Sequence, residues 1–546
     1  MAVLLFFGNR QVLFLNMIMK THFLWTLVAC ATGVPVSSVS FAQQIQINEL
    51  KTVAESSGYQ ATATHAQVAE MCKQLSTSKR IHLASMGKSH EHRDMPLLVV
   101  SKNGTVQKPA DCETEKLVVF VMANIHAGEV CGKEALLMLA RELAIGDQHL
   151  LDDLIILLAP IYNPDGNERF AKDNRPGQLG PAMGMGQRHN GQDLDLNRDN
   201  IKHESPEGRA LAKLITDWKP DVCIDTHTTN GSLHRYTITY DGPRHPATPG
   251  DLVEYTRDTY LPAVGKKLQT TGYDSFFYGN FNQPHDRWNT YPDYPRYCTH
   301  YFGMRGTIGV LSEAYSYATY KDRVLGTRDF VRSCLQTAAG DKSKIKTLLA
   351  DALLADKNAT EFPIQSIPVP LGTFDVLGYV EELKNGKRVK TDKDKVYPCE
   401  YFGVSRPQKI VSRPFAYAIS HEYEQVIDVI ASHGITVNEL DKNTNVKCES
   451  YAITSLEVAE REFQGHRMVE VTGTEKISGS RMLAKGTVII KTNQPMLGGL
   501  IVNMLEPEAS DGLCAWNFFD KDLLSDGTAI MGAKFPVLRV MDKIVD

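Results

Sequence analysis

At 546 residues the chain is too long for a single hydrophobic core, and two or three domains are expected. An apolar content of 42% and a charged content of 23% are ordinary for a globular protein. The formal net charge of -5 leaves no excess of basic residues, which argues against nucleic acid and anionic membrane surfaces as partners.

The first 42 residues have the composition of an export signal. They contain Arg10 and Lys20 but no acidic residue. An uncharged stretch from Phe23 leads to Ser-Phe-Ala at residues 40–42, which is the small-x-small form of a signal-peptidase site. We therefore expect residues 1–42 to be removed and the mature protein to be secreted or periplasmic.

Three details of this segment leave alternatives open. Met17 or Met19 is a more natural start, so residues 1–16 need not be translated. Pro35 interrupts the apolar run, which makes a membrane-spanning helix the weaker interpretation. The four residues that end at Cys30 resemble a lipoprotein cleavage box, and lipid attachment at Cys30 is the minority alternative.

Residues 117–340 alternate apolar, strand-like runs with amphipathic helical stretches. Strands are predicted at 117–123, 154–161, 221–226 and 307–311, and helices near 131–144 and from Ser205-Pro206 to Trp218. Serine as N-cap followed by proline is typical of a helix start. The alternation predicts an α/β fold, with a mostly parallel twisted sheet flanked by helices.

The pattern of apolar and polar residues changes after about residue 358. Residues 485–503, for example, alternate valine, isoleucine and threonine with glycine and asparagine, and only residues 413–440 keep a helical pattern. We predict an α/β domain over 43–345, a linker over 346–359 and a smaller β-rich domain over 360–546. A packing partner, a substrate gate and a carbohydrate-binding module are the open interpretations of the β-rich domain.

Four ionisable residues directly follow three of the predicted strands. His126 and Glu129 follow 117–123, His227 follows 221–226, and Glu313 follows 307–311. In an open α/β sheet this edge is where ligands bind. Two histidines and one glutamate can hold one ion and leave a fourth position for water, as catalytic zinc requires. A cysteine-ligated site is not supported, because the chain contains no CxxC pair.

The chain also carries five short motifs in a fixed order. They are Asn124-Ile125-His126-Ala127-Gly128-Glu129, Tyr162-Asn163-Pro164-Asp165-Gly166, Asp195-Leu196-Asn197-Arg198, Asp225-Thr226-His227 and Leu311-Ser312-Glu313-Ala314-Tyr315. With them, about residues 48–340 resemble the zinc carboxypeptidase family, which includes the pancreatic enzymes. Five motifs in order are far more specific than His-x-x-Glu alone, which often arises by chance.

The resemblance implies both the fold and the metal chemistry. It implies a zinc carboxypeptidase-like sheet, one Zn²⁺ per chain held by His126, Glu129 and His227, and Glu313 as the general base. It also implies that Asp195 orients the His126 ring. This role is physically sound, since metal-bound imidazoles usually donate their other N–H to a carboxylate or carbonyl.

Asn197 and Arg198 match the family's pair that holds the terminal carboxylate of the substrate. A planar guanidinium suits this role because it can make two parallel hydrogen bonds to carboxylate oxygens. The alternative is that Arg198 is a surface arginine paired with Asp199. Its position between the other motifs favours substrate binding.

One departure from the family pattern concerns the arginine that stabilises the oxyanion. In the family this arginine follows an Asn-Arg pair by three positions. Asn174-Arg175 is present here, but Gln178 stands at that position. We predict Arg188 for this catalytic role, with Arg175 as the alternative.

A second assignment concerns the mobile tyrosine that closes over the substrate in the family. It lies 22 residues before the general base, and Tyr291 has that spacing from Glu313. Tyr294, Tyr297 and Tyr301 lie close by in the sequence, and packing roles are expected for most of these tyrosines.

These residues together predict a secreted zinc metallocarboxypeptidase. It would hydrolyse the C-terminal peptide bond of a peptide with a free C-terminus, by zinc-activated water with Glu313 as general base. One alternative is a peptidoglycan-peptide hydrolase or an acyl-amino-acid amidase on the same zinc site. The remote alternative is a non-catalytic binding protein, which would need a lost ligand or a lost base.

Overall fold

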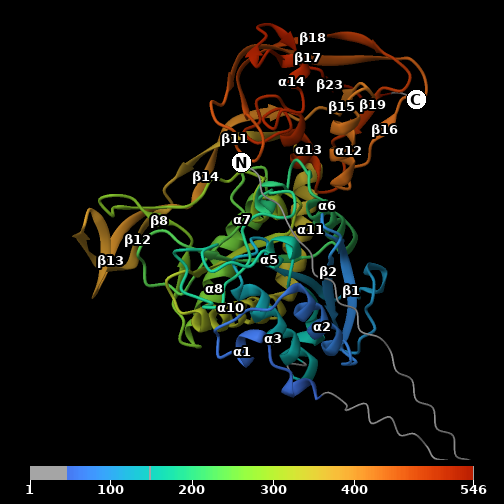
Figure 1. Ribbon diagram of the computed structural model, residues 1–546. Helices are drawn as coiled ribbons and strands as arrows, with labels where there is room; N and C mark the ends of the chain where they lie inside the picture. The colour runs from blue at the N-terminus through green and yellow to red at the C-terminus, as the bar shows by residue number, and fades with distance from the viewer. Residues whose placement is uncertain (1–45, 147–148, 545–546) are drawn as a thin grey trace, which may run out of the picture. The chain divides into compact units, whose positions relative to one another are not determined.

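A computed structural model describes residues 46–146 and 149–544 (Figure 1). The described residues form one compact unit. The predicted export signal over residues 1–42 lies outside the described residues. Among the helices that are described, none combines the length and the hydropathy needed to cross a membrane.

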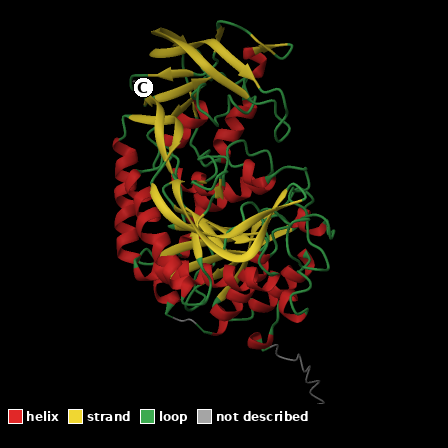
Figure 2. Ribbon diagram, turned by 90° about the vertical axis from the view of Figure 1, so that its left-hand side faces the viewer, coloured by secondary structure: helices red, strands yellow, loops and turns green. Residues whose placement is uncertain are grey.

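The first part of the described chain is built around an eight-stranded sheet in the order β1-β2-β4-β3-β5-β10-β6-β7. Its strands are β1 (Ile81–Lys88), β2 (Asp94–Val100), β3 (Leu117–Ala123), β4 (Leu154–Ala159), β5 (Val222–Thr229), β6 (Ile238–Asp241), β7 (Ser275–Phe277) and β10 (Ile308–Tyr315). The pairs β3–β4, β3–β5, β5–β10 and β6–β7 are parallel, and β1–β2, β2–β4 and β6–β10 are antiparallel. The predicted α/β architecture is confirmed (Figure 2).

Helices cover this sheet, and their starts follow from the sequence. They are α1 (Val53–Ser56), α2 (His65–Leu75), α3 (Cys131–Ile145), α4 (Leu150–Asp153), α5 (Pro164–Glu168), α6 (Pro206–Trp218), α7 (Gly250–Tyr255), α8 (Leu261–Gln269), α9 (Cys298–Met304) and α10 (Tyr320–Gly340). The Ser205 hydroxyl accepts a hydrogen bond from the Gly208 N–H at 2.9 Å, so Ser205 caps α6 as predicted. Asn163 caps α5 in the same way, through the Gly166 N–H.

Successive residues of the central strands face two different core layers, because side chains alternate across a strand. On β3, Val119 and Val121 belong to a core that includes α3 and α10, whereas Phe120 belongs to a second core. The second core includes side chains of α6 and α9 and continues into the C-terminal part of the chain, where Leu500 and Trp516 are fully buried. The main sheet and the C-terminal part therefore share a hydrophobic core.

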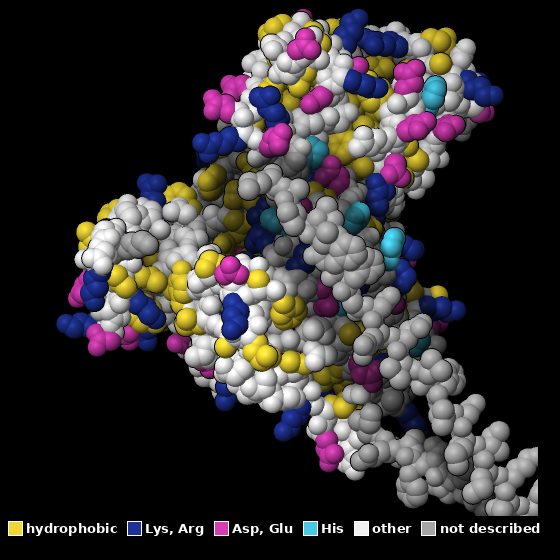
Figure 3. Space-filling model, in the orientation of Figure 1, with side chains coloured by type: hydrophobic (Ala, Val, Ile, Leu, Met, Phe, Trp, Pro, Cys, Tyr) yellow, Lys and Arg dark blue, Asp and Glu magenta, His cyan; other side chains and the backbone are white. Residues whose placement is uncertain are grey.

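The C-terminal part is rich in strands. A sheet in the order β16-β19-β15-β23-β17-β18, with β22 on β17, forms its main layer. Its strands are β15 (Ala416–Ile419), β16 (Asn438–Glu439), β17 (Thr444–Val458), β18 (Val469–Leu483), β19 (Val488–Lys491), β22 (Ala533–Lys534) and β23 (Leu538–Val540), with helices α12 (Glu424–Ser432), α13 (Gly498–Leu505) and α14 (Asp520–Leu523) beside them. Charged side chains of both signs are interspersed over the face in Figure 3, as the small net charge leads one to expect.

Two further sheets follow α11, and one of them contains strands of both parts. Strand β11 (Glu361–Val369) pairs with β14 (Val404–Ser412). The long hairpin of β12 (Gly372–Lys384) and β13 (Lys387–Phe402) extends a sheet that also contains β9 (Arg287–Asn289) and β8 (Asn280–Phe281) from the first part. The predicted domain boundary at residue 360 stays a prediction, but the strands beyond it do not pair only with one another.

Three local predictions differ from the structure. The predicted linker over 346–359 lies almost wholly in helix α11 (Lys342–Asn358), because its leucine, alanine and lysine residues are strong helix formers. Residues 498–505 form α13 within a stretch predicted to be strand-like. Strands β5 and β10 continue past the predicted ends to Thr229 and Tyr315, because their polar ends pair with each other in parallel register.

Candidate active site with a metal centre

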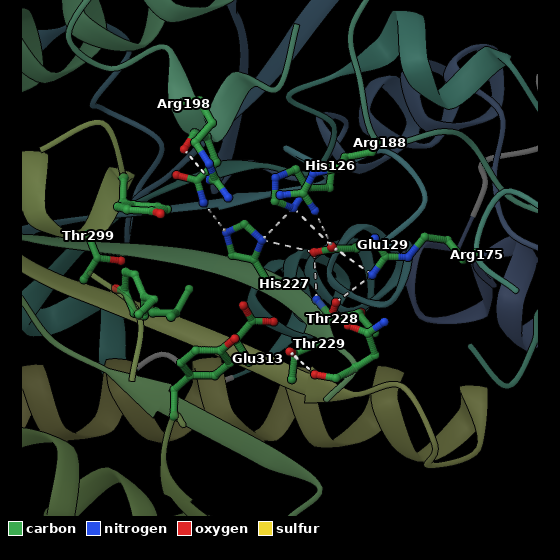
Figure 4. A pocket seen from close by; sticks show the side chains of 16 residues that line it. His126, Glu129, Arg175, Arg188, Arg198, His227, Thr228, Thr229, Thr299 and Glu313 are labelled. Atoms are coloured by element: carbon green, nitrogen blue, oxygen red, sulfur yellow. Dashed lines mark hydrogen bonds and ion pairs between the residues drawn. The ribbon is translucent and has the colours of Figure 1, made fainter. Parts of the chain in front are cut away.

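Three side chains converge on one point, two from the turn that follows β3 and one from the neighbouring strand β5. The Nδ1 atoms of His126 and His227 lie 3.2 Å apart. Each lies close to an oxygen of the Glu129 carboxylate, at 3.1 Å for His126 and 3.0 Å for His227. All three side chains are buried, and their ligand atoms point toward one another (Figure 4).

The turn between β3 and α3 positions His126 and Glu129. Asn124 begins the turn with a φ of 67°, and its side-chain amide donates to the Ala127 carbonyl at 3.1 Å. The Glu129 N–H donates to the His126 carbonyl at 2.9 Å, which places both side chains on the same side of the turn. Gly128 is needed for packing, since a Cβ there would lie 2.7 Å from the Gly186 carbonyl oxygen.

A carboxylate lies behind each of the two imidazoles. The Nε2 of His126 is 3.0 Å from Asp195 Oδ1, and the Nε2 of His227 is 2.7 Å from Asp225 Oδ2. Burial alone would raise the pKa of Asp195, but His126 and the neighbouring arginines hold it well below its usual value. An ionised Asp195 only accepts hydrogen bonds, so the Nε2–H of His126 donates to it, and the Nδ1 atom of that ring faces Glu129 and His227.

This arrangement fits a metal cation. The Nδ1 atoms of both histidines and the Glu129 carboxylate oxygens face one another at about 3 Å, so all three side chains could bind one cation together. Two imidazole nitrogens and a carboxylate oxygen are a donor set suited to catalytic zinc, and carboxylates behind the imidazoles are the usual supporting groups. Among the described residues, this is the group of three that could hold such an ion.

Glu313 lies next to the candidate metal centre without belonging to it. Its backbone pairs in register with that of His227 across β10 and β5, contrary to the prediction that both residues lie beyond their strands. One carboxylate oxygen, Oε2, is buried and has no hydrogen-bond partner among the described residues. Burial raises the pKa of Glu313 to about 8, against the opposing effect of His227. A cation at the three ligand atoms would favour the ionised form.

Both candidate arginines reach the centre. Arg188 donates from Nε to Asp195 Oδ2 at 2.8 Å, and its Nη1 lies 3.7 Å from Glu129 Oε1. Arg175 lies closer to the ligand set, with Nη2 at 3.0 Å from Glu129 Oε1 and a hydrogen bond to the Thr228 carbonyl. Both Arg188, the predicted oxyanion arginine, and Arg175, its alternative, therefore lie near the Glu129 carboxylate.

Asn197 and Arg198 extend from the short 3₁₀ helix Leu196–Arg198, whose N-cap is Asp195. The Asn197 side-chain oxygen accepts from the Cys298 N–H at 2.9 Å. The Arg198 guanidinium lies 4.5 Å from the centre of the Tyr297 ring and lines the same pocket. Asp199, the alternative partner of Arg198, instead accepts hydrogen bonds from Ser205 and Lys202.

The four neighbouring tyrosines have different positions. Tyr291 lines the pocket, and its ring is stacked on His300 at 5.0 Å. Tyr297 also lines the pocket, whereas Tyr294 lines a separate cavity and Tyr301 is fully buried. The spacing that selected Tyr291 thus selected a residue at the pocket wall.

The pocket that joins these residues is a cavity of about 210 Å³. Its other walls include Thr228, Thr229, Asn230, Tyr278, Thr299 and Leu311. The Thr228 N–H donates to Glu129 Oε2 at 2.9 Å and fixes that carboxylate from behind. The cavity is thus open to a ligand at the three metal-ligand candidates, at Glu313 and at the arginines together.

Several residues of this site were not predicted from the sequence, and Asp225 and Tyr278 show two different reasons. Asp225 was assigned no role, although it lies two positions before His227 on one strand and must therefore share its face. Tyr278 was missed because it lies 35 residues before Glu313 without a motif around it, and only the fold brings it to the pocket. The sequence therefore contained a signal for Asp225, namely its spacing from His227, but none for Tyr278.

Comparisons with known proteins agree with this geometry. Residues 68–292 match the family model described as zinc carboxypeptidase. The chain is 20% identical to carboxypeptidase 2 of Trichophyton tonsurans over 477 residues, which cover 83% of this chain and 81% of that protein. It is 34% identical to carboxypeptidase Z of Homo sapiens over 148 residues, which cover 25% of this chain and 21% of that protein.

Among solved structures, a metallo-carboxypeptidase from Burkholderia cenocepacia is similar with a TM-score of 0.37 and 16% identity, over 50% of this chain and 69% of that chain. The segment matched by the family model contains His126, Glu129 and His227. Fold, site and family match together define a zinc metallopeptidase. Over residues 68–292 the chain is similar to the zinc carboxypeptidase family, and over 83% of its length it is similar to carboxypeptidase 2 of Trichophyton tonsurans.

Proposed function

We propose that this protein is a zinc-dependent metallocarboxypeptidase that removes the C-terminal residue from peptides. The observation that carries the proposal is the convergence of His126, Glu129 and His227 with a carboxylate behind each imidazole. One Zn²⁺ per chain is expected at these atoms. When bound, zinc polarises the scissile carbonyl and makes water more acidic.

Glu313 is proposed as the general base. It would take the proton of the attacking water and deliver it to the amine that leaves. The position of Glu313 beside His227 and the unpaired Oε2 atom support this role, since a base must have a free oxygen that faces the reacting water.

Arg198 and Asn197 are proposed to hold the free carboxylate of the substrate. The Arg198 side chain is fixed against Tyr297, which keeps its planar guanidinium at the pocket wall. Arg188 is proposed to stabilise the oxyanion, with Arg175 as its neighbour across Glu129. Tyr291 is proposed to close over the bound substrate. Export to the periplasm or the medium is proposed from residues 1–42 alone.

A matched pair of peptides tests this function. The two have the same neutral sequence, one with a free C-terminal carboxylate and one with an amide, and mass spectrometry follows their digestion. The free acid should be shortened one residue at a time, the amide should react at least about tenfold more slowly, and a chelator should stop both reactions. Equal cleavage of the two peptides, or internal cleavage, would contradict a carboxypeptidase.

A further inference from the structure

A loop from the C-terminal part of the chain contacts Asp195, whose carboxylate binds the His126 ring. The loop joins β17 to β18 and comprises residues 459–468. The side-chain oxygen of Gln464 accepts a hydrogen bond from the backbone N–H of Asp195 at 2.8 Å. The two residues are 269 positions apart in the sequence, so only the docking of the C-terminal part creates this contact.

Asp195 is the residue through which this contact would act. Its carboxylate accepts from His126 Nε2 at 3.0 Å, from the Asn197 N–H at 3.0 Å and from Arg188 Nε at 2.8 Å. A candidate metal ligand, a substrate-binding residue and an arginine of the pocket thus share one carboxylate. A shift of the Asp195 backbone would therefore move the carboxylate to which all three residues are hydrogen-bonded. The hydrogen bond from the Asp195 N–H to Gln464 holds this backbone in place.

The loop presents Gln464 in an unusual backbone conformation. Phe463 and His466 exchange backbone hydrogen bonds of 2.8 and 3.1 Å, with Gln464 and Gly465 between them. The φ angles of Gln464 and Gly465 are 53° and 76°, the pattern of a type I′ turn. Asparagine, aspartate or glycine fits the first central position of such a turn at lower cost. The longer glutamine side chain is what reaches Asp195.

Other contacts hold the loop in place without Gln464. The His466 Nε2 atom lies 2.8 Å from Glu204 Oε1. The Phe463 ring is stacked on Trp516, and the Arg296 guanidinium lies over both rings, at 5.4 and 4.6 Å. Arg296 is buried and pairs with Asp511. The loop is therefore anchored on both sides of the turn that carries Gln464.

We infer that Gln464 is a positioning residue of the active centre, which acts through the backbone of Asp195 to hold the His126 ring in line for the metal. The C-terminal part thereby completes the active site rather than only covering it. The inference rests on the proposed function, in which His126 holds zinc and Asp195 orients it. The inference gives the β-rich part the role of positioning Asp195. This role differs from those of a substrate gate or a carbohydrate-binding module.

Two variants of the full-length protein test it. Gln464→Ala removes the acceptor for the Asp195 N–H, whereas His466→Ala removes a contact of the same loop that does not involve Asp195. The zinc dissociation constant is measured by competition with a chromophoric chelator, and kcat, KM and the thermal midpoint are measured in parallel. Gln464→Ala should bind zinc roughly tenfold more weakly, the low end for groups behind a metal ligand, and should lower kcat with little change in KM.

The matched variants should separate positioning from docking. His466→Ala should keep the zinc affinity and kcat of the wild type, with at most a lower thermal midpoint. Gln464→Glu keeps an acceptor oxygen at the same reach and should restore the zinc affinity. Wild-type affinity in Gln464→Ala, an equal loss in His466→Ala, or no rescue by glutamate would overturn the inference.

The zinc measurement also keeps this inference apart from the proposed function. If the wild type binds zinc but does not shorten the free-acid peptide, the carboxypeptidase proposal fails. The difference in zinc affinity between Gln464→Ala and His466→Ala still decides the role of Gln464 in that case.

Discussion

The α/β part and the β-rich C-terminal part of this chain differ in how their contacts relate to the sequence. In the α/β part, His126 and Glu129 are three residues apart and Asp225 and His227 two, so each pair is positioned by one turn or one strand. In the C-terminal part, Gln464 meets its partner across 269 residues. Contacts between residues a few positions apart can be predicted from their spacing in the sequence. A contact between residues far apart in the sequence cannot be predicted in this way.

The two parts are nevertheless one folded body in physical terms. Phe120 of the central sheet and Trp516 of the C-terminal part belong to the same buried core. Arg296 of the first part is buried against Asp511 of the second. The comparison thus teaches that the chemistry is concentrated in one part while its support comes from both, and variants in each part can test this.

The largest effect is expected at Glu313, within the α/β part. Glu313→Gln keeps the shape of the side chain but cannot accept a proton, so kcat should fall by about a thousandfold or more. Zinc content should stay at the wild-type level, because Glu313 is not among the three converging ligands. Steady-state kinetics and elemental analysis measure the two quantities. Near-normal turnover would remove Glu313 from the proposed mechanism.

The next effect concerns stability at the contact between the two parts. Arg296→Ala would leave the buried Asp511 without its charged partner, although Trp516 Nε1 and the backbone N–H of residue 296 still donate to it. The loss of one partner of a buried ion pair typically costs about 3–5 kcal/mol in the free energy of unfolding. Arg257→Ala is the matched control, since Arg257 pairs with the half-exposed Asp258 and should change stability by less than about 1 kcal/mol. Urea denaturation measures both. Equal, small changes would mean that the parts are held together elsewhere.

A smaller effect is expected at the carboxylates behind the imidazoles. Asp225→Asn should weaken zinc binding by roughly 10–100-fold, because an amide orients the His227 ring less well than a carboxylate. Asp195→Asn should do the same through His126. Chelator competition measures both. If only one variant loses affinity, the imidazole with the unaffected partner is oriented by another group.

The smallest effect expected in the α/β part is selective for the substrate. Arg198→Ala should lower kcat/KM for a free-acid peptide by at least about tenfold, since a charge-assisted hydrogen bond is worth roughly 1.5–3 kcal/mol. The amidated peptide should be almost unaffected, because it carries no charge for the guanidinium to meet. A similar loss for both peptides would assign Arg198 to the packing of Tyr297 instead.

The sequence predicted the parts of this molecule that depend on local order. It predicted the α/β sheet, β3 with its observed bounds, and the N-cap of α6, because apolar runs and capping residues act within a few positions. It placed His227 and Glu313 beyond their strands, because paired polar residues inside a buried sheet read as a loop. The linker was predicted where α11 forms.

Contacts formed only by tertiary packing could not be predicted. Tyr278 reaches the pocket and Gln464 reaches Asp195 without any motif around them. Arg188 and Arg175 remained alternatives because both belong to the segment that leads to the site, and only the folded chain shows that both lie near Glu129. Spacing in the sequence can identify residues that lie together on one helix, strand or turn. Contacts between residues on different elements depend on how those elements pack in the folded chain.

The central claim is that His126, Glu129 and His227 hold one catalytic zinc ion. The most direct test is an anomalous difference map at the zinc absorption edge, from crystals of the zinc-loaded protein. The account predicts one strong peak bonded to Nδ1 of both histidines and to the Glu129 carboxylate, at about 2.0–2.2 Å. A peak bonded through Nε2, a peak elsewhere, or no peak at full zinc saturation would contradict it.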